Sequence, residues 1–123
     1  MDLFNKVIAL DKMATDYGFT WTHHSQLIEQ LLSECKEVEE VIDAPEKRAH
    51  LEEELGDLMF TAIALCIFCH FDPHSTIDKS LQKFEKRFNK MKEIVTEEGY
   101  KTLKNQPMEV LKEFWDKAKK AVS

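Results

Sequence analysis

The twelve uncharged residues from Leu58 to Cys69 (LMFTAIALCIFC) constrain the fold more than any other feature of this chain. They form the second half of a helix expected over residues 45–70, whose first half is charged. A helix that is apolar on every side has to be covered on every side, and twelve residues are too few to cross a bilayer. Because a chain of 123 residues offers few other helices for this, we expect a second copy to complete the core, in a homodimer or a dimer of dimers. A central helix in a monomeric bundle is the alternative.

The remainder of the sequence also predicts helices. Only three glycines and three prolines are present, which argues against a many-turned β-fold and against disorder. Apolar residues recur at helical spacing, and no strand alternation or internal repeat is visible. We expect one all-α domain, residues 1–123, whose five helices cover about 2–17, 25–43, 45–70, 73–99 and 107–120. Gly18 is expected to end the first helix, and Asp72 with Pro73 to begin the fourth.

The charges are segregated along the chain. The 23 acidic and 17 basic residues give a net charge of −6, which argues against general nucleic-acid binding. Residues 29–57 contain eleven acids and three bases, whereas residues 79–92 contain six bases and one acid. The first segment is suited to cations and the second to anions. Three cysteines in apolar surroundings predict no disulfide framework, and no signal-peptide pattern is present, so we expect a cytoplasmic protein with no membrane partner.

Two pairs of carboxylates are candidates for chemistry: Glu34 with Glu37, and Glu54 with Asp57. Residues three apart share one face of a helix, and antiparallel packing of the two helices would bring all four together. Glu34 and Glu54 also lie on apolar stripes, where an acid costs free energy unless it is paired or bound to a metal. An oxygen-only ligand set favours Mg²⁺ or Mn²⁺ over zinc. A solvated acidic face is the alternative interpretation.

The segments around these acids resemble a known family. LLSECKEVEE followed by LEEELGDLMF is similar to the MazG-type all-α nucleoside triphosphate pyrophosphohydrolases, whose hallmark is ExxE followed by ExxD. Here the two motifs are Glu34–Glu37 and Glu54–Asp57, with sixteen residues between them. KFEKRF (residues 83–88) and EFWDKAK (residues 113–119) resemble two further motifs of the family, KFxxRF and LWxxAK. The resemblance runs from about Trp21 to Lys119. The chain departs from the family at Ser33, where a Glu is frequent, and at Leu81, where many members have Asn.

The resemblance implies a fold, a cofactor and a reaction. It implies a MazG-like helical bundle that binds Mg²⁺, with Mn²⁺ as a possible substitute, and hydrolyses (deoxy)nucleoside triphosphates to the monophosphate and pyrophosphate. Clearance of noncanonical or surplus nucleotides is the role it suggests. The residue roles follow the family motifs: metal ligands Glu34, Glu37, Glu54 and Asp57; Glu53 as an outer acid or proton acceptor; Lys83 and Arg87 at the triphosphate; and Trp115 and Lys119 completing the substrate site.

Other interpretations of the same residues remain open. Lys83 and Arg87 can belong to the solvated face of the fourth helix, and Trp115 can serve packing alone. The whole chain can be a catalytically weak MazG-like bundle that acts as a nucleotide-binding or regulatory module, or a related hydrolase that also accepts diphosphates. A di-iron bundle is excluded because no histidine follows a glutamate by three positions. P-loop chemistry is excluded because the chain has no Walker A motif.

Overall fold

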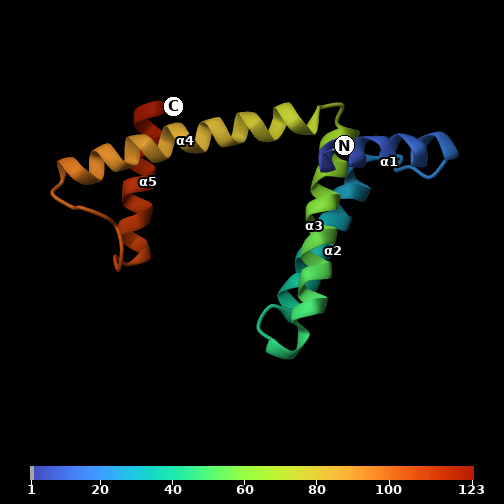
Figure 1. Ribbon diagram of the computed structural model, residues 1–123, viewed down its shortest axis with the longest axis horizontal. Coiled ribbons are helices and arrows are strands. Elements are labelled where there is room, and N and C mark those ends of the chain that lie inside the picture. Colours follow the sequence, from blue (N-terminus) through green and yellow to red (C-terminus); the bar gives the residue numbers. More distant parts are fainter. Residues whose placement is uncertain (1) are drawn as a thin grey trace. The chain divides into compact units, whose positions relative to one another are not determined.

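The computed structural model describes residues 2–123 and confirms the all-α fold. Over these residues it contains five α-helices, one short 3-10 helix and no strand (Figure 1). The elements in chain order are α1 (Leu3–Tyr17), α2 (His24–Val41), η1 (Pro45–Lys47), α3 (Arg48–Phe68), α4 (Pro73–Glu97) and α5 (Met108–Val122).

The end of α1 and the start of α4 lie where the sequence predicts them. Gly18 ends α1 with φ at 100°, and its N–H donates to the carbonyls of Ala14 and Thr15. A left-handed backbone at this position favours glycine, because other side chains are strained there. At the start of α4, the Ser75 N–H donates to Asp72 Oδ2 at 3.0 Å, which satisfies one of the free N–H groups in the first turn of the helix.

Two helix starts differ from the expected ones. The predicted third helix opens as the 3-10 turn η1, with Pro45 in its first turn, so α3 begins at Arg48. Helix α2 begins one residue early, because His23 caps it: its ring Nδ1 accepts from the Ser25 N–H at 3.1 Å. The Gln26 side-chain oxygen accepts from the His23 N–H at 3.1 Å in return. Gln at the third helical position is a known cap partner, but His is not among the usual capping residues.

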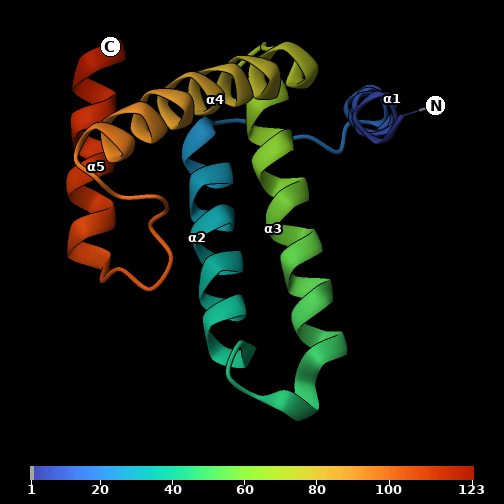
Figure 2. The ribbon, with the colours of Figure 1, turned by 60° about the vertical axis from the view of Figure 1, so that its left-hand side comes forward.

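The chain divides into two compact units, Met1–Thr76 and Ile77–Ser123. In the first unit, α2 and α3 run antiparallel, side by side, and are joined by the short connection that contains η1 (Figure 2). Helix α1 packs against α3. The buried side chains between α2 and α3 include Leu27, Val41 and Leu51. This hairpin is the element that positions the predicted acidic residues.

The second unit is formed by most of α4, the loop that follows it, and α5. Val95, Phe114 and Ala118 are its buried residues. Tyr100, in the loop, meets the Phe114 ring edge-on with centroids 5.5 Å apart. Lys117 Nζ of α5 lies 3.2 Å from Glu98 Oε2, just past the end of α4. These contacts attach α5 to the C-terminal part of α4.

Several large apolar side chains of α3 and α4 are exposed to solvent in the single chain. In the apolar half of α3, Met59 is 66% exposed and Phe60 51%. Leu81 and Phe84 of α4 are also exposed. Across the described residues, no single helix is long and apolar enough to cross a bilayer, although Pro45–Phe68 and Pro73–Glu97 pass that test when taken together.

Candidate functional site

Three carboxylates converge between α2 and α3 in the first unit. Glu34, Glu54 and Asp57 each offer an oxygen, and these three atoms all lie within 4.8 Å of one another. Glu34 is only 7% exposed and the Glu54 side chain only 13%, whereas Asp57 is open to solvent. The antiparallel hairpin therefore brings residues from both predicted motifs to one point, with its two glutamates on the inner side.

Glu37 lies beside this group of three. The Glu54 carboxyl raises the pKa of Glu37 above its usual range, first through hydrogen bonding and then through like-charge repulsion. Glu37 itself is exposed. Its oxygens are not among those that lie within 4.8 Å of one another. The structure thus places Glu37 next to the carboxylates of α3, at the solvent side of the cluster.

Two oxygens of the cluster are buried without a partner. Glu34 Oε2 and Glu54 Oε2 find no hydrogen-bond donor among the described residues. The other oxygen of each group is bonded: Gln30 Nε2 donates to Glu34 Oε1 at 2.7 Å, and His50 Nε2 lies 3.1 Å from Glu54 Oε1. A buried carboxylate oxygen without a partner is costly. A divalent cation bound by oxygen ligands removes that cost, so the residues present fit Mg²⁺ or Mn²⁺.

Glu53 lies outside the three-carboxylate cluster. It precedes Glu54 in α3 and is exposed. Its oxygens are not part of the group within 4.8 Å. Neighbouring residues of a helix point about 100° apart around its axis, which is why Glu53 and Glu54 diverge.

The second unit contains the predicted substrate residues. Arg87 of α4 and Lys119 of α5 line one shallow hollow of about 360 Å³, together with Asp116, Lys120 and Ser123. Trp115 is half-buried and packs on Phe84, with ring centroids 5.5 Å apart. Lys83 is exposed and does not line this hollow. The unit therefore brings Arg87 and Lys119 together, and Trp115 has a packing partner within its own unit.

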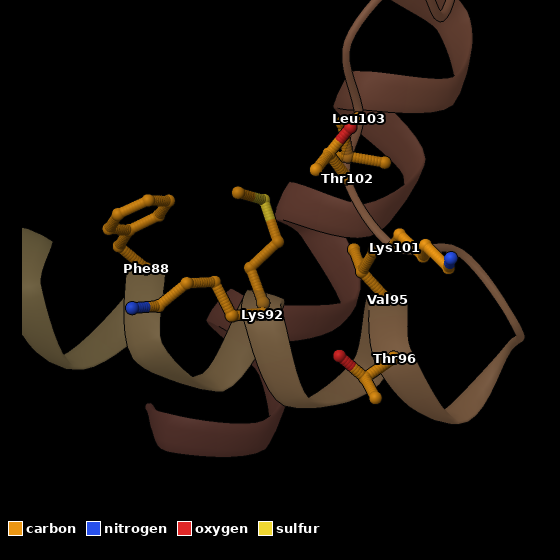
Figure 3. Close-up of a pocket in the computed structure, with 8 residues that line it drawn as sticks. Phe88, Lys92, Val95, Thr96, Lys101, Thr102 and Leu103 are labelled. Atoms are coloured by element: carbon orange, nitrogen blue, oxygen red, sulfur yellow. The ribbon is translucent and has the colours of Figure 1, made fainter.

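A second hollow in this unit was not anticipated from the sequence. It has a volume of about 350 Å³ and lies between the last turns of α4 and the loop that follows (Figure 3). Its walls are largely apolar and include Phe88, Val95 and Leu103. The ammonium group of Lys92 lies 5.0 Å from the centre of the Phe88 ring. Helical spacing identifies Phe88 and Val95 as an apolar stripe but does not show that a loop only partly covers it.

A comparison with known protein families shows to which family this chain belongs. The sequence pattern of the MazG nucleotide pyrophosphohydrolase domain matches residues 22–92 of the chain. This chain belongs to the MazG family. The matched region includes both acidic motifs, Lys83 and Arg87, and ends before Trp115 and Lys119.

Individual MazG proteins are similar over a longer stretch. The nucleoside triphosphate pyrophosphohydrolase/pyrophosphatase MazG of Thermotoga maritima is 38% identical over 110 residues, which are 89% of this chain and 41% of that protein. The nucleoside triphosphate pyrophosphohydrolase of Escherichia coli K12 is 30% identical over 112 residues, 90% of this chain and 42% of that protein. The chain thus spans about two fifths of the length of these curated relatives.

Proposed function

We propose that this MazG-family chain hydrolyses nucleoside triphosphates, including deoxynucleotides, to the monophosphate and pyrophosphate. The observation that carries the proposal is the convergence of Glu34, Glu54 and Asp57 with two buried, unpartnered carboxylate oxygens. Solvated acidic faces do not bury such oxygens. The names of the T. maritima and E. coli relatives supply the reaction class, and clearance of noncanonical or surplus nucleotides is the role that we propose.

Glu34, Glu54 and Asp57, with Glu37 beside them, are the proposed ligands of Mg²⁺, for which Mn²⁺ can substitute. When bound, such an ion offsets charge on phosphate oxygens and lowers the pKa of a coordinated water. Glu34 and Glu54 would direct their free Oε2 atoms to it, and Asp57 would contribute from the solvent side. The exposed carboxylate of Glu53 is the proposed proton acceptor.

The proposed role of the basic residues is to bind the substrate's phosphates. The guanidinium of Arg87 can form two parallel hydrogen bonds to a phosphate, and Lys119 lines the same hollow. Lys83, one turn before Arg87, would add positive charge. Trp115 presents an aromatic face beside Phe84 on which a base can stack.

The proposed assembly is a homodimer or a dimer of dimers, with residues 1–123 of each copy forming one MazG domain. Its support is the exposure of Met59 and Phe60 in the apolar half of α3, because a soluble assembly does not leave a large apolar face open. A second copy would cover this face.

The test is release of pyrophosphate and monophosphate from a panel of ribo-, deoxyribo- and damaged nucleoside triphosphates, with and without Mg²⁺. Glu37→Gln and Asp57→Asn are compared with Glu39→Gln and Glu52→Gln, exposed acids of the same two helices. We expect Mg²⁺-dependent release that falls at least ~100-fold in the first two variants, the scale seen when one electrostatic group of a catalytic site is lost, and is unchanged in the controls. If folded protein with ample Mg²⁺ shows no turnover, the chain is not an enzyme, and a nucleotide-binding or regulatory module is then supported.

A further inference from the structure

The two buried glutamates of the cluster have the same local arrangement on different helices. Gln30 precedes Glu34 by four residues on α2, and His50 precedes Glu54 by four residues on α3. Residues four apart lie on one face of a helix, one turn from each other. In both pairs a side-chain nitrogen of the earlier residue bonds Oε1 of the later glutamate, at 2.7 Å and 3.1 Å respectively.

In both pairs the second oxygen is left free. Oε2 of Glu34 and Oε2 of Glu54 are the buried side-chain atoms without a partner among the described residues. An ionised carboxylate only accepts hydrogen bonds, so the contact between His50 Nε2 and Glu54 Oε1 is a hydrogen bond when the Nε2 tautomer of His50 faces an ionised Glu54. A donor that holds Oε1 limits rotation of the carboxylate group. The free oxygen of each glutamate is thereby fixed in direction before any ligand binds.

The side chains of Gln30 and His50 are chemically suited to orienting a carboxylate that binds a cation. A glutamine amide, and an imidazole in its neutral form, orient a carboxylate without cancelling its charge. A lysine or arginine at the same position would form an ion pair and compete with a cation for both oxygens. Partners of this kind around metal ligands typically change metal affinity by 10- to 100-fold.

We propose that Gln30 and His50 are positioning residues, which orient Glu34 and Glu54 so that both Oε2 atoms face one divalent cation. This inference rests on the metal site proposed above and adds the residues that hold two of its ligands in place. Neither residue contacts the cation. Each acts through the glutamate that it holds.

The experiment is a titration of the full chain with Mn²⁺ alone at pH 8, read by the electron paramagnetic resonance signal of free Mn²⁺. Gln30→Leu and His50→Leu remove the donors. His50→Gln retains a donor and places on α3 the Gln–Glu pair that α2 already contains. Gln82→Leu is the matched control, because Gln82 Nε2 donates to Asp78 Oδ2 at 2.6 Å, in another pair of residues four apart on α4.

We expect the dissociation constant for Mn²⁺ to rise about tenfold in Gln30→Leu and His50→Leu. In His50→Gln, which retains a donor to Glu54, the dissociation constant should stay clearly below that of His50→Leu, and in Gln82→Leu it should be unchanged. Thermal unfolding without metal checks that each variant folds, and Gln30→Ala and His50→Ala replace a leucine variant that does not.

Three results would overturn the inference in distinguishable ways. If the donor-free variants bind Mn²⁺ as tightly as the parent, Gln30 and His50 do not position the ligands. If His50→Gln is as weak as His50→Leu, donation to Glu54 is not the role of His50. If the parent itself binds no Mn²⁺, the metal site fails, and the positioning role fails with it.

Discussion

Glu37 shows how strongly the carboxylates of the α2–α3 hairpin interact. Its pKa is raised by the neighbouring Glu54 although Glu37 is exposed. A protonated Glu37 can donate to Glu54, whereas an ionised one repels it. A bound cation would remove this repulsion, and protons and a cation compete for the same carboxylate oxygens.

Glu37→Gln is predicted to have opposite effects on stability and on activity. The glutamine amide donates to Glu54 without binding a proton, so the metal-free variant should unfold at a higher temperature than the parent at pH 8. The raised pKa of Glu37 means that its ionised form destabilises the parent only as the pH rises through that pKa. The difference in melting temperature between variant and parent should therefore shrink towards pH 4. Thermal unfolding in a chelator measures this effect. Equal melting temperatures of variant and parent at pH 8 would contradict it.

The acid pairs of the site could be predicted from the sequence, but their partners could not. Glu34 and Glu54 are conspicuous because they are charged and lie on apolar stripes. Gln30 and His50 have no such signal, since every helical residue has a neighbour four positions earlier. Only the rotamers in the structure show that a nitrogen of each residue lies at hydrogen-bond distance from Oε1 of its glutamate and that Oε2 has no partner.

His74 connects the start of α1 to the start of α4 within the first unit. Its Nε2 lies 3.0 Å from Asp2 Oδ1 and its Nδ1 lies 3.3 Å from Asp72 Oδ1. Asp2 caps α1 and Asp72 caps α4. The Phe4 ring packs edge-on against the imidazole at 5.5 Å. Hydrogen bonds to Asp2 and then to Asp72 raise the pKa of His74.

We predict that α1 is held more firmly at pH 6 than at pH 8. Protonated His74 stabilises the contact between α1 and the start of α4. This contribution is fully present below the ordinary histidine pKa of about 6.5 and is lost as the pH rises through the raised pKa. Asp2 and Asp72 have lowered pKa values, chiefly through the N–H groups of Asn5 and Ser75. Their contribution is present above about 3.8 and is lost as the pH falls through the lowered values.

Amide hydrogen exchange of α1, corrected for the intrinsic pH dependence of exchange, measures this effect. Protection should fall between pH 6 and pH 8 in the parent and be independent of pH over that range in His74→Gln. A fall of the same size in the variant would show that His74 does not secure α1.

The sequence predicts where a helix begins or ends when one or two residues determine that boundary. Gly18 and the Asp72–Pro73 pair act through local backbone geometry, and both ends lie where expected. The start of α2 depended on a histidine cap, and the start of α3 on a 3-10 turn that Pro45 accommodates. The hollow beside Phe88 depends on the path of the loop after α4, which periodicity does not describe.

Charge and apolar surface are unevenly distributed along the chain. Residues 1–76 carry fifteen acidic and five basic side chains, whereas residues 77–123 carry eight acidic and twelve basic ones. The first unit is therefore suited to a cation and the second to phosphate. Met59 and Phe60, in the apolar half of α3, add apolar surface that a single chain leaves exposed.

Phe60→Lys is predicted to weaken self-association. Full burial of a phenylalanine side chain contributes roughly 1.5–3 kcal/mol. Phe60 is 51% exposed in one chain, so about half of that value would come from each of two copies, and the dissociation constant of the assembly should rise at least about tenfold. Sedimentation velocity over a range of concentrations measures it. Met108→Lys, at an exposed apolar residue of α5, is the control. A parent chain that sediments as a monomer at every concentration would contradict the proposed assembly.

The position of attack on the triphosphate is tested by following the oxygen of water through the reaction. The protein is supplied with Mg²⁺ and a deoxynucleoside triphosphate in H₂¹⁸O, and mass spectrometry locates the label. Attack at the α-phosphorus predicts ¹⁸O in the nucleoside monophosphate and unlabelled pyrophosphate, with labelling abolished by Glu54→Gln and retained in Glu52→Gln. Label in pyrophosphate or in orthophosphate would contradict attack at the α-phosphorus, and equal labelling in Glu54→Gln would contradict a role for the carboxylate cluster.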